Sequence, residues 1–358
     1  MNNRIKRVLS NMKDHGFSQL IVSDPKSIKY LTGIEIEPYE RLFAFLIKED
    51  GKHVFFLNNL FTVPKTTFEE VWFSDTDDSI SMIAEKLSGG TLGIDKTWAA
   101  RFLIPLMERR SDIKVVLGSD CVDDSRAIKD DTEISIMKKA SEINDTVMHK
   151  ALDFIKEGMT EKQVADFIDA QFIKEGATGS SFTTIVSFAG NGADPHHEPD
   201  DTVLKKGDAI VIDQGCMYEG YASDMTRSVV CGEPSDPEYK KVHDLVRQAN
   251  EKAESIIKPG VKLCDIDAAA RDLITDAGYG VYFNHRLGHF IGQTDHEQGD
   301  VSSVNQNTVK PGMIFSIEPG IYLPGRFGVR IEDLVLVTED GCEVLNHEDK
   351  HLRSVGND

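Results

Sequence analysis

The sequence lacks the features that mark several classes of protein. No apolar run approaches the roughly 18 residues that a membrane-spanning helix needs, and the first apolar residues have helical spacing instead of a signal peptide's continuous core. Cysteine is scarce: five scattered residues without a C-x-x-C pair argue against a disulfide framework and predict a reducing cytoplasm. Positive charge is also in short supply, because 40 Lys and Arg stand against 60 Asp and Glu, a net charge of -20. Such a surface repels phosphate backbones and anionic lipid, so neither nucleic acid nor a membrane is an expected partner.

Hydrophobic patterning predicts two domains. Residues 1–122 alternate helical and strand patterns, with a buried strand at 19–22 and a hairpin across Asp50-Gly51, which predicts an α/β domain. The polar stretch 123–131 predicts a linker. The remainder, 132–358, opens with a long helical pattern and predicts a larger second domain.

The second domain contains an internal repeat. Within each pair of similar segments, the matching residues are separated by the same number of positions. The paired segments are 155–177 with 257–279, 206–215 with 311–320, and 223–230 with 331–338. The first pair predicts a turn, an amphipathic helix and a glycine stop in each copy. The other two pairs are apolar strands that each carry an acidic residue. Packing of the two halves about a pseudo-two-fold axis would bring the acids together.

Four acidic residues fall in register between the two halves. They are Asp213, Asp224, Glu318 and Glu332. One acid beside a strand is usually a solvated strand end. Four acids in apolar strands would repel one another strongly in a low dielectric. The simplest remedy is two divalent cations held by bridging carboxylates.

His289 is the candidate nitrogen ligand of this cluster. A lone histidine is more often a hydrogen-bonded core residue, but Gly288 and Gly292 on either side allow close backbone approach. Four carboxylates and one imidazole favour Mn²⁺ or Co²⁺ over a thiolate-type zinc site. Two such metals can share a hydroxide that attacks a carbonyl, while nearby imidazoles move protons. The candidate imidazoles are His196, His285 and His296, and each of them is otherwise a surface or structural histidine.

One further motif is interpreted as coincidental. HEDKH (347–351) fits the zinc-peptidase pattern H-E-x-x-H. That pattern works on a helix in the protein interior, whereas here it lies in a charged tail with few residues after it to supply a third ligand. We therefore expect no zinc site there.

Several stretches together resemble one known family. They are VIDQGCMYEGYASDMTR, HRLGHFIG, FSIEPGIY and GVRIED. They resemble the pita-bread metallopeptidases, which include prolidase, aminopeptidase P and methionine aminopeptidase, with creatinase as a metal-free relative. The likeness covers nearly the whole chain, because RAIKDDTEISIMKKA resembles the junction after a creatinase-type N-terminal domain. It implies an α/β creatinase-type domain at 1–122 and a pita-bread α+β catalytic domain at 132–358.

The resemblance also implies roles for single residues. The implied ligands are Asp213 for one metal, Asp224 and Glu332 bridging both, and His289 and Glu318 for the other. The implied catalytic residues are His196, His285, His296 and Glu318. Two divalent metal ions are expected, with Mn²⁺ as the predicted metal and Co²⁺ or Zn²⁺ as alternatives.

Within this family the chain is most similar to bacterial proline dipeptidases. Their N-terminal domain carries a loop, matched here by EPYER (37–41), that reaches the partner subunit's active site, so a homodimer is implied. Tyr39 stands where those enzymes have a histidine and is a candidate for substrate binding. Arg286 is the candidate for holding a dipeptide carboxylate, since a guanidinium fork matches a carboxylate. Arg330 is a second candidate and is also expected to brace Glu332.

The sequence therefore predicts a cytoplasmic enzyme that hydrolyses the Xaa-Pro bond of dipeptides. That bond is a tertiary amide without an N–H group, so peptidases that hydrogen-bond this group fail on it. The alternatives are an Xaa-Pro aminopeptidase for longer peptides, and a metal-free creatinase-like hydrolase or non-catalytic binding protein of the same fold. The presence of all five ligands argues against the metal-free alternatives.

Overall fold

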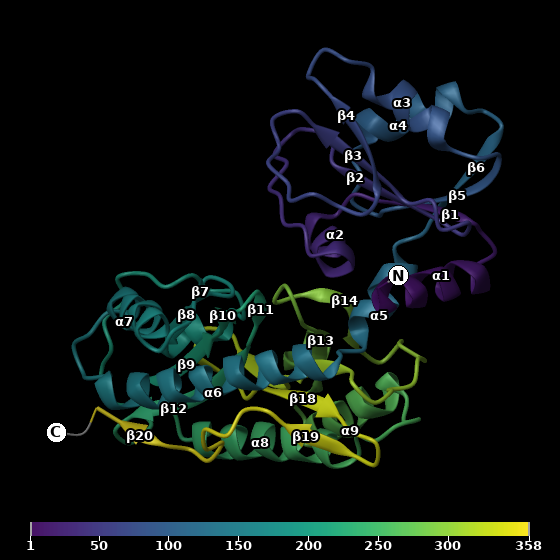
Figure 1. The fold of residues 1–358 in the computed structure, drawn as a ribbon. Helices are drawn as coiled ribbons and strands as arrows, with labels where there is room; N and C mark the ends of the chain where they lie inside the picture. Colours follow the sequence, from purple (N-terminus) through teal and green to yellow (C-terminus); the bar gives the residue numbers. More distant parts are fainter. Residues whose placement is uncertain (1, 357–358) are drawn as a thin grey trace. The chain divides into compact units, whose positions relative to one another are not determined.

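The structure is a computed structural model that describes residues 2–356. The chain forms two compact units, Met1–Arg126 and Ala127–Asp358 (Figure 1). The segment 123–131, expected to be a linker, is largely helical: α5 (Asp120–Ala127) covers its first part and α6 begins at its end. Acidic residues stabilise the first turn of a helix, so the charges that suggest a linker also suit α5.

The N-terminal unit is an α/β domain built on one mixed sheet of order β4-β3-β2-β1-β5-β6. Its strands and helices are β1 (Gln19–Val22), β2 (Ala44–Lys48), β3 (Val54–Asn58), β4 (Glu69–Phe73), β5 (Gly90–Ile94), β6 (Ile113–Leu117), α1 (Asn3–Asp14), α2 (Pro25–Thr32), α3 (Ser79–Lys86) and α4 (Ala100–Arg109). The predicted buried strand and hairpin are confirmed as β1 and the antiparallel pair β2–β3.

Both faces of this sheet are covered, because successive strand residues point to opposite sides. Leu20 and Val22 of β1 pack with Val8 of α1 on one face. Ile21, between them, packs with Ile83 of α3 on the other. The continuous apolar sequence of β1 follows from this two-sided burial.

The C-terminal unit is an α+β domain. Its elements are α6 (Asp131–Phe154), α7 (Glu161–Lys174), α8 (Tyr239–Ser255), α9 (Leu263–Asp276), the 3-10 turns η1 (Ala189–Ala193) and η2 (Gly280–Tyr282), and strands β7 (Gly179–Ser180), β8 (Ile185–Phe188), β9 (Ala209–Gln214), β10 (Cys216–Tyr218), β11 (Tyr221–Ala222), β12 (Met225–Cys231), β13 (Gly288–Phe290), β14 (Glu297–Val301), β15 (Ile314–Ile317), β16 (Gly320–Leu323), β17 (Phe327–Arg330), β18 (Asp333–Val337), β19 (Cys342–Val344) and β20 (Ser354–Val355). The strands form sheets β20-β12-β9-β8, β14-β13-β15-β18-β19, β11-β10-β7 and β16-β17.

The predicted repeat is confirmed in the arrangement of this unit. Helices α6 and α7 lie side by side and share one core with β8, β9 and β12. Helices α8 and α9 lie side by side and share another core with β13, β15 and β18 (Figure 1). The turns that lead into α7 and α9 place Gly158 and Gly260 at φ 88° and 90°, a conformation that favours glycine.

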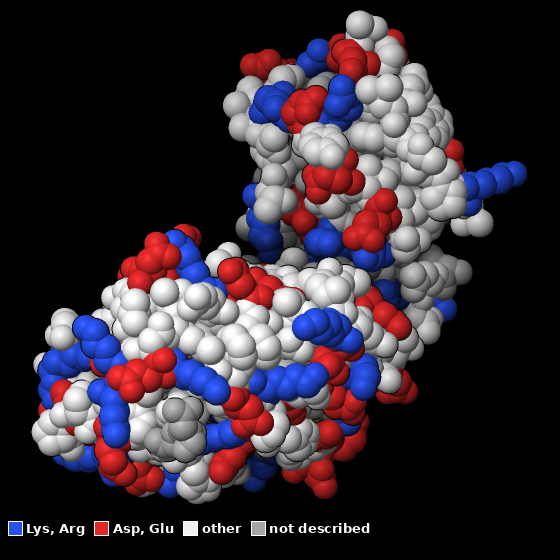
Figure 2. All heavy atoms as spheres, turned by 90° about the vertical axis from the view of Figure 1, so that its left-hand side faces the viewer, with Lys and Arg blue, Asp and Glu red and all other residues white. Residues whose placement is uncertain are grey.

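No helix within residues 2–356 is long and apolar enough to cross a bilayer. Among the described residues on the face drawn in Figure 2, basic side chains lie between acidic ones. On that face the acidic side chains are therefore not gathered in one patch.

Candidate metal centre

Two strand pairs bring the four predicted acids to one place. In β9–β12, Asp213 is paired with Thr226, two residues after Asp224. In β15–β18, Ile317 is paired with Asp333, so Glu318 and Glu332 leave the same end of that pair. Side chains two residues apart on a strand share a face, and so do residues opposite each other in an antiparallel pair. Each strand pair therefore directs both of its acids to one side.

His289 on β13 lies among three of these acids. Its Nε2 is 3.4 Å from Asp224 Oδ2, 3.6 Å from Glu318 Oε1 and 3.8 Å from Glu332 Oε1. Donor atoms of Asp224, His289 and Glu332 all lie within 4.8 Å of one another. Asp213 lies next to them, and it lines the same cavity as the other four residues.

The hydrogen bonding of this cluster fits a cation. Three buried carboxylate oxygens have no hydrogen-bond partner: Asp213 Oδ1, Asp224 Oδ1 and Glu332 Oε1. Buried polar atoms are nearly always partnered, and three such oxygens on three predicted ligands have room for metal coordination. His289 Nδ1 faces the carbonyl oxygen of Phe290 at 3.3 Å, which leaves Nε2 free to act as a ligand.

Gly288, next to His289, allows the backbone of β13 to lie close to that of β15. A Cβ atom on Gly288 would lie 1.9 Å from the carbonyl oxygen of Ser316, so no larger residue fits. At this approach the Ser316 hydroxyl accepts a hydrogen bond from the His289 amide and lies 3.2 Å from Glu318 Oε1. The expected close backbone approach is confirmed at this position.

Crowding perturbs the ionisation of the acids. Burial, reinforced by the charge of Glu332, holds the pKa of Asp224 well above its ordinary value. The same two causes raise the pKa of Glu318 to about 8. Without a cation, therefore, the cluster retains protons at neutral pH.

The contribution of Glu318 to the stability of the metal-free protein is expected to fall as pH rises from about 4.5 to about 8. In that window Glu318 is protonated in the folded protein but ionised in the unfolded chain, so folding takes up protons. Metal ligands must lose those protons, so the stabilisation by Mn²⁺ should grow over the same window. At 100 times Kd the gain is about 2.7 kcal/mol. Thermal melts at pH 6 and pH 8, with Mn²⁺ or a chelator, measure both trends; equal Mn²⁺ shifts at the two pH values would contradict this prediction.

A cavity of about 870 Å³ opens beside the acids, within the size range of small-ligand sites. The predicted histidines and arginines all line it: His196, His285, His296, Arg286 and Arg330. The His296 ring lies 4.0 Å from that of His289, and its Nδ1 pairs with Asp295 at 3.0 Å. Tyr39 lies in the N-terminal unit, 79% exposed, and its contact with substrate stays a prediction.

His285 is held in one neutral tautomer. Its Nδ1 is 2.7 Å from the carbonyl oxygen of Arg286, which only accepts, so Nδ1 carries the hydrogen. Its Nε2 then accepts from the Tyr322 hydroxyl at 3.0 Å. Burial, aided by the positive charge of Arg330, lowers the pKa of His285 to about 4, so the ring is uncharged at neutral pH.

Arg330 braces a different acid from the one expected. Its Nη2 pairs with Asp213 Oδ2 at 2.7 Å, and its Nη1 donates to the Tyr322 hydroxyl at 3.0 Å. It reaches Glu332 only through Thr226, whose hydroxyl accepts from Arg330 Nε and donates to Glu332 Oε2 at 2.7 Å. Arg330 therefore contacts Glu332 through Thr226, while its own ion pair is with Asp213 on β9.

Sequence reasoning missed three residues around the cavity. Thr226 and Tyr322 are the first two, and strand alternation offers a signal for Thr226, two positions after Asp224. The third is Glu161, whose buried carboxylate accepts from Phe188 N, Asn191 Nδ2, His197 Nε2 and Asp200 N. Glu161 therefore holds the loop that carries His196. As the first residue of α7 it reads as an ordinary solvated helix start, so no sequence signal marks it.

Comparison with known proteins gives consistent matches. Residues 135–339 match metallopeptidase family M24, and residues 4–128 match the creatinase/prolidase N-terminal domain. An uncharacterized peptidase of Staphylococcus aureus is 38% identical over 353 residues, 97% of this chain and 99% of the relative. The crystal structure of dipeptidase PepE from Mycobacterium ulcerans has a TM-score of 0.94 at 34% identity, over 99% of this chain and 97% of that one. A recombinant prolidase from Thermococcus sibiricus has a TM-score of 0.90 at 34% identity, over 99% and 100%.

Proposed function

This chain belongs to metallopeptidase family M24, and we propose that it hydrolyses the bond before proline in Xaa-Pro dipeptides. The proposal is carried by the three buried carboxylate oxygens without hydrogen-bond partners, on Asp213, Asp224 and Glu332, which line one cavity with His289. Such a cluster has no evident purpose in a scaffold. Full-length similarity to a prolidase and a dipeptidase supports the choice of substrate.

The residues around the cavity divide the work of binding and hydrolysis. When bound, two divalent cations would polarise the scissile carbonyl and lower the pKa of water. Asp213, Asp224, Glu318, Glu332 and His289 would hold them. His285 accepts a hydrogen bond from the Tyr322 hydroxyl, whose oxygen accepts one from Arg330. His196 and His296, exposed at the cavity wall, are available to donate to a developing oxyanion and to move protons.

Arg286 supplies the cationic group for a substrate carboxylate. It lines the cavity, and four of the five donors of its neighbour Arg330 are already used by Thr226, Pro195, Tyr322 and Asp213. The carboxylate of a dipeptide is the group proposed to pair with Arg286. The second candidate, an Xaa-Pro aminopeptidase, needs a cavity that leaves the carboxyl side open.

We propose Mn²⁺ as the metal, since carboxylate-rich donor sets suit it. A cytoplasmic location is supported by the five free cysteines. A homodimer is supported by the likeness of the segment 37–41 to a loop of proline dipeptidases, which reaches the active site of the partner subunit.

The deciding experiment compares Ala-Pro and Leu-Pro with Ala-Pro-Ala, in protein stripped of metal and reloaded with Mn²⁺, Co²⁺ or Zn²⁺. Cleavage of the dipeptides alone, dependent on metal, is the expected result. Cleavage of the tripeptide would move the assignment to an aminopeptidase. Two bound metals without cleavage of any of these peptides would contradict the proposed substrate class.

A further inference from the structure

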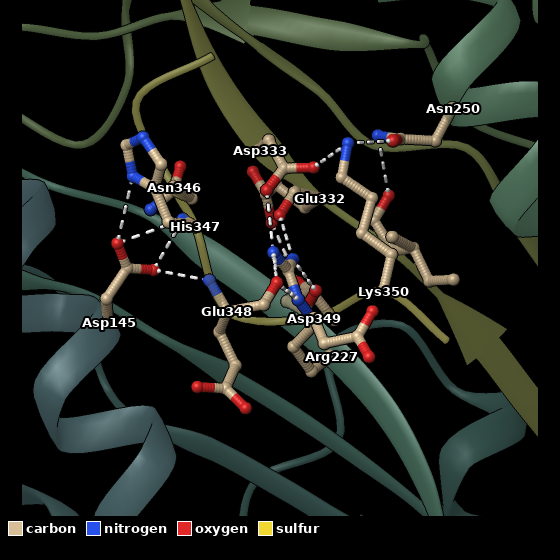
Figure 3. A network of polar contacts seen from close by, with 12 residues as sticks. Asp145, Arg227, Asn250, Glu332, Asp333, Asn346, His347, Glu348, Asp349 and Lys350 are labelled. Carbon is tan, nitrogen blue, oxygen red and sulfur yellow. Dashed lines mark hydrogen bonds and ion pairs between the residues drawn. The ribbon is translucent and has the colours of Figure 1, made fainter. Parts of the chain in front are cut away.

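The C-terminal segment, residues 346–351, has a role other than the one its H-E-x-x-H spelling suggests. It forms neither a helix nor a strand. Its backbone is tied to α6, because the carboxylate of Asp145 accepts hydrogen bonds from the amides of His347 at 2.8 Å and Glu348 at 3.0 Å (Figure 3). The segment therefore has a fixed path across the C-terminal unit.

That path brings the carbonyl of Glu348 to Arg227, a fully buried residue of β12. Arg227 uses all five of its donors. Nε and Nη2 donate to the carbonyl oxygen of Glu348, Nη2 also to Asp333 Oδ1 at 2.8 Å, and Nη1 to the carbonyl oxygens of Thr226 and Glu332. Figure 3 shows the guanidinium between the C-terminal segment and the start of β18.

Strand alternation relates this network to the candidate metal centre. Thr226 and Glu332 point toward the metal centre, so their neighbours Arg227 and Asp333 point to the opposite face. Arg227 directly follows Thr226, and Asp333 directly follows Glu332. Arg227 pairs with Asp333 and donates to the carbonyl oxygen of Glu332, so it holds the backbone of Glu332 from the face opposite the metal centre.

Lys350 lies at the centre of the polar network on this opposite face. Its Nζ lies 2.7 Å from Asp333 Oδ2, 2.7 Å from Glu254 Oε2 and 2.7 Å from Asn250 Oδ1. The side chain is only 16% exposed and is the cation between two carboxylates, one fully buried and one nearly so. Figure 3 shows Lys350 beside Asp333 and Asn250.

Asn250 extends the contacts of Lys350 to both predicted ligands of the second half. With its oxygen facing Lys350, its Nδ2 donates to the carbonyl oxygen of Ile317 at 2.9 Å and lies 3.4 Å from that of Ile331. These are the residues immediately before Glu318 and Glu332. Lys350 thus orients the Asn250 amide, which links the backbone before Glu318 to the backbone before Glu332.

We propose that Lys350 is a positioning residue for the metal centre, acting through Asn250 and Asp333 on Glu318 and Glu332. The proposal rests on the proposed function, because it assigns those two acids to metal binding. Contacts one shell behind metal ligands orient them, and losing one costs about 10- to 100-fold in metal affinity or activity. Without Lys350, the carboxylates of Asp333 and Glu254 would lose the cation between them, and the backbone at Glu332, directly before β18, would shift.

The test measures Mn²⁺ dissociation constants of the full chain by competition with a chelating dye, well below the melting temperature of every variant. Lys350→Met is expected to raise the dissociation constant of the weaker Mn²⁺ about 10- to 100-fold. With Ala-Pro at saturating Mn²⁺, kcat should fall while KM stays near the wild-type value. Lys350→Arg, which keeps the charge, should recover most of the affinity.

Two further variants separate positioning from folding. Asn250→Leu removes the amide that ties the two backbones without removing a buried charge, and it should weaken Mn²⁺ binding in the same direction even if Lys350→Met does not fold. Arg353→Ala is the matched control, since Arg353 belongs to the same tail but pairs with the carboxylates of Asp153 and Glu348 instead of with Asp333 or Glu254. Wild-type dissociation constants in Lys350→Met or Asn250→Leu, or an equal loss in Arg353→Ala, would overturn the proposal. A wild-type protein that binds no Mn²⁺ would overturn the proposed function as well, and this is seen without any variant.

Discussion

Asp224→Asn is expected to lower kcat/KM for Ala-Pro at least about a thousandfold, because metal-ion catalysis contributes several kcal/mol and each 1.36 kcal/mol is tenfold. Asp224 would hold the metals together with His289, since its Oδ2 lies 3.4 Å from His289 Nε2 and its Oδ1 has no hydrogen-bond partner. An amide of the same shape would lack the negative charge that a carboxylate ligand offers to a cation. Metal analysis of the purified variant should give fewer bound ions than the wild type.

The same variant should gain stability without metal. Burial and the neighbouring charge of Glu332 raise the pKa of Asp224, so the folded wild type is penalised once pH exceeds the ordinary value for an aspartate. Asparagine carries no charge and removes this penalty. Chelator-treated Asp224→Asn should therefore melt above chelator-treated wild type at pH 8.

A matched control is available in the same domain. Asp267 is also fully buried, but it pairs with Arg271 on α9, which donates to the backbone carbonyl of His285 and not to a proposed metal ligand. Asp267→Asn should lose stability while keeping the wild-type metal content. An Asp224→Asn enzyme with two bound metals and wild-type turnover would show that the metal centre is wrongly assigned.

Much of this site could be predicted from the sequence, because the patterns that mark its acids lie within short segments of the chain. Asp213 follows an apolar strand, and its counterpart Glu318 follows another at a constant offset, so burial and register can be read together. Strand alternation then fixes which neighbours share a face. The site residues could be grouped before any three-dimensional contact was known.

What the sequence could not give depends on contacts between distant segments. Lys350 meets Asn250 and Asp333 only in the folded chain, and HEDKH matches a zinc pattern in spelling while lacking the helix that the pattern requires. Arg330 was expected at Glu332, its near neighbour in sequence, but it pairs with Asp213 far along the chain. Long flexible side chains are the hardest to assign, because several acids lie within their reach.

Arg330→Met is expected to destabilise the metal-free protein by about 3–5 kcal/mol, the usual effect of removing one partner of a buried ion pair. For a domain of this size that is a drop of roughly 6–20 °C in Tm. Arg330 lies within 2.7 Å of Asp213 Oδ2 and donates to the Tyr322 hydroxyl, so its loss leaves a buried carboxylate uncompensated. Differential scanning fluorimetry in the presence of a chelator measures the drop.

Added metal distinguishes this loss from ordinary core damage. If Asp213 is a metal ligand, Mn²⁺ supplies the positive charge that Arg330 gave, so the deficit in Tm should shrink when Mn²⁺ is saturating. Arg330→Lys keeps the charge but not the planar fork that reaches Asp213, Tyr322 and Thr226 at once, and it should lie between wild type and Arg330→Met. Lys240→Met, at an exposed ion pair with Glu233, is the control and should leave Tm nearly unchanged. A deficit in Arg330→Met that Mn²⁺ does not reduce would separate Asp213 from the metal centre, because the carboxylate left without its arginine would then have gained no cation.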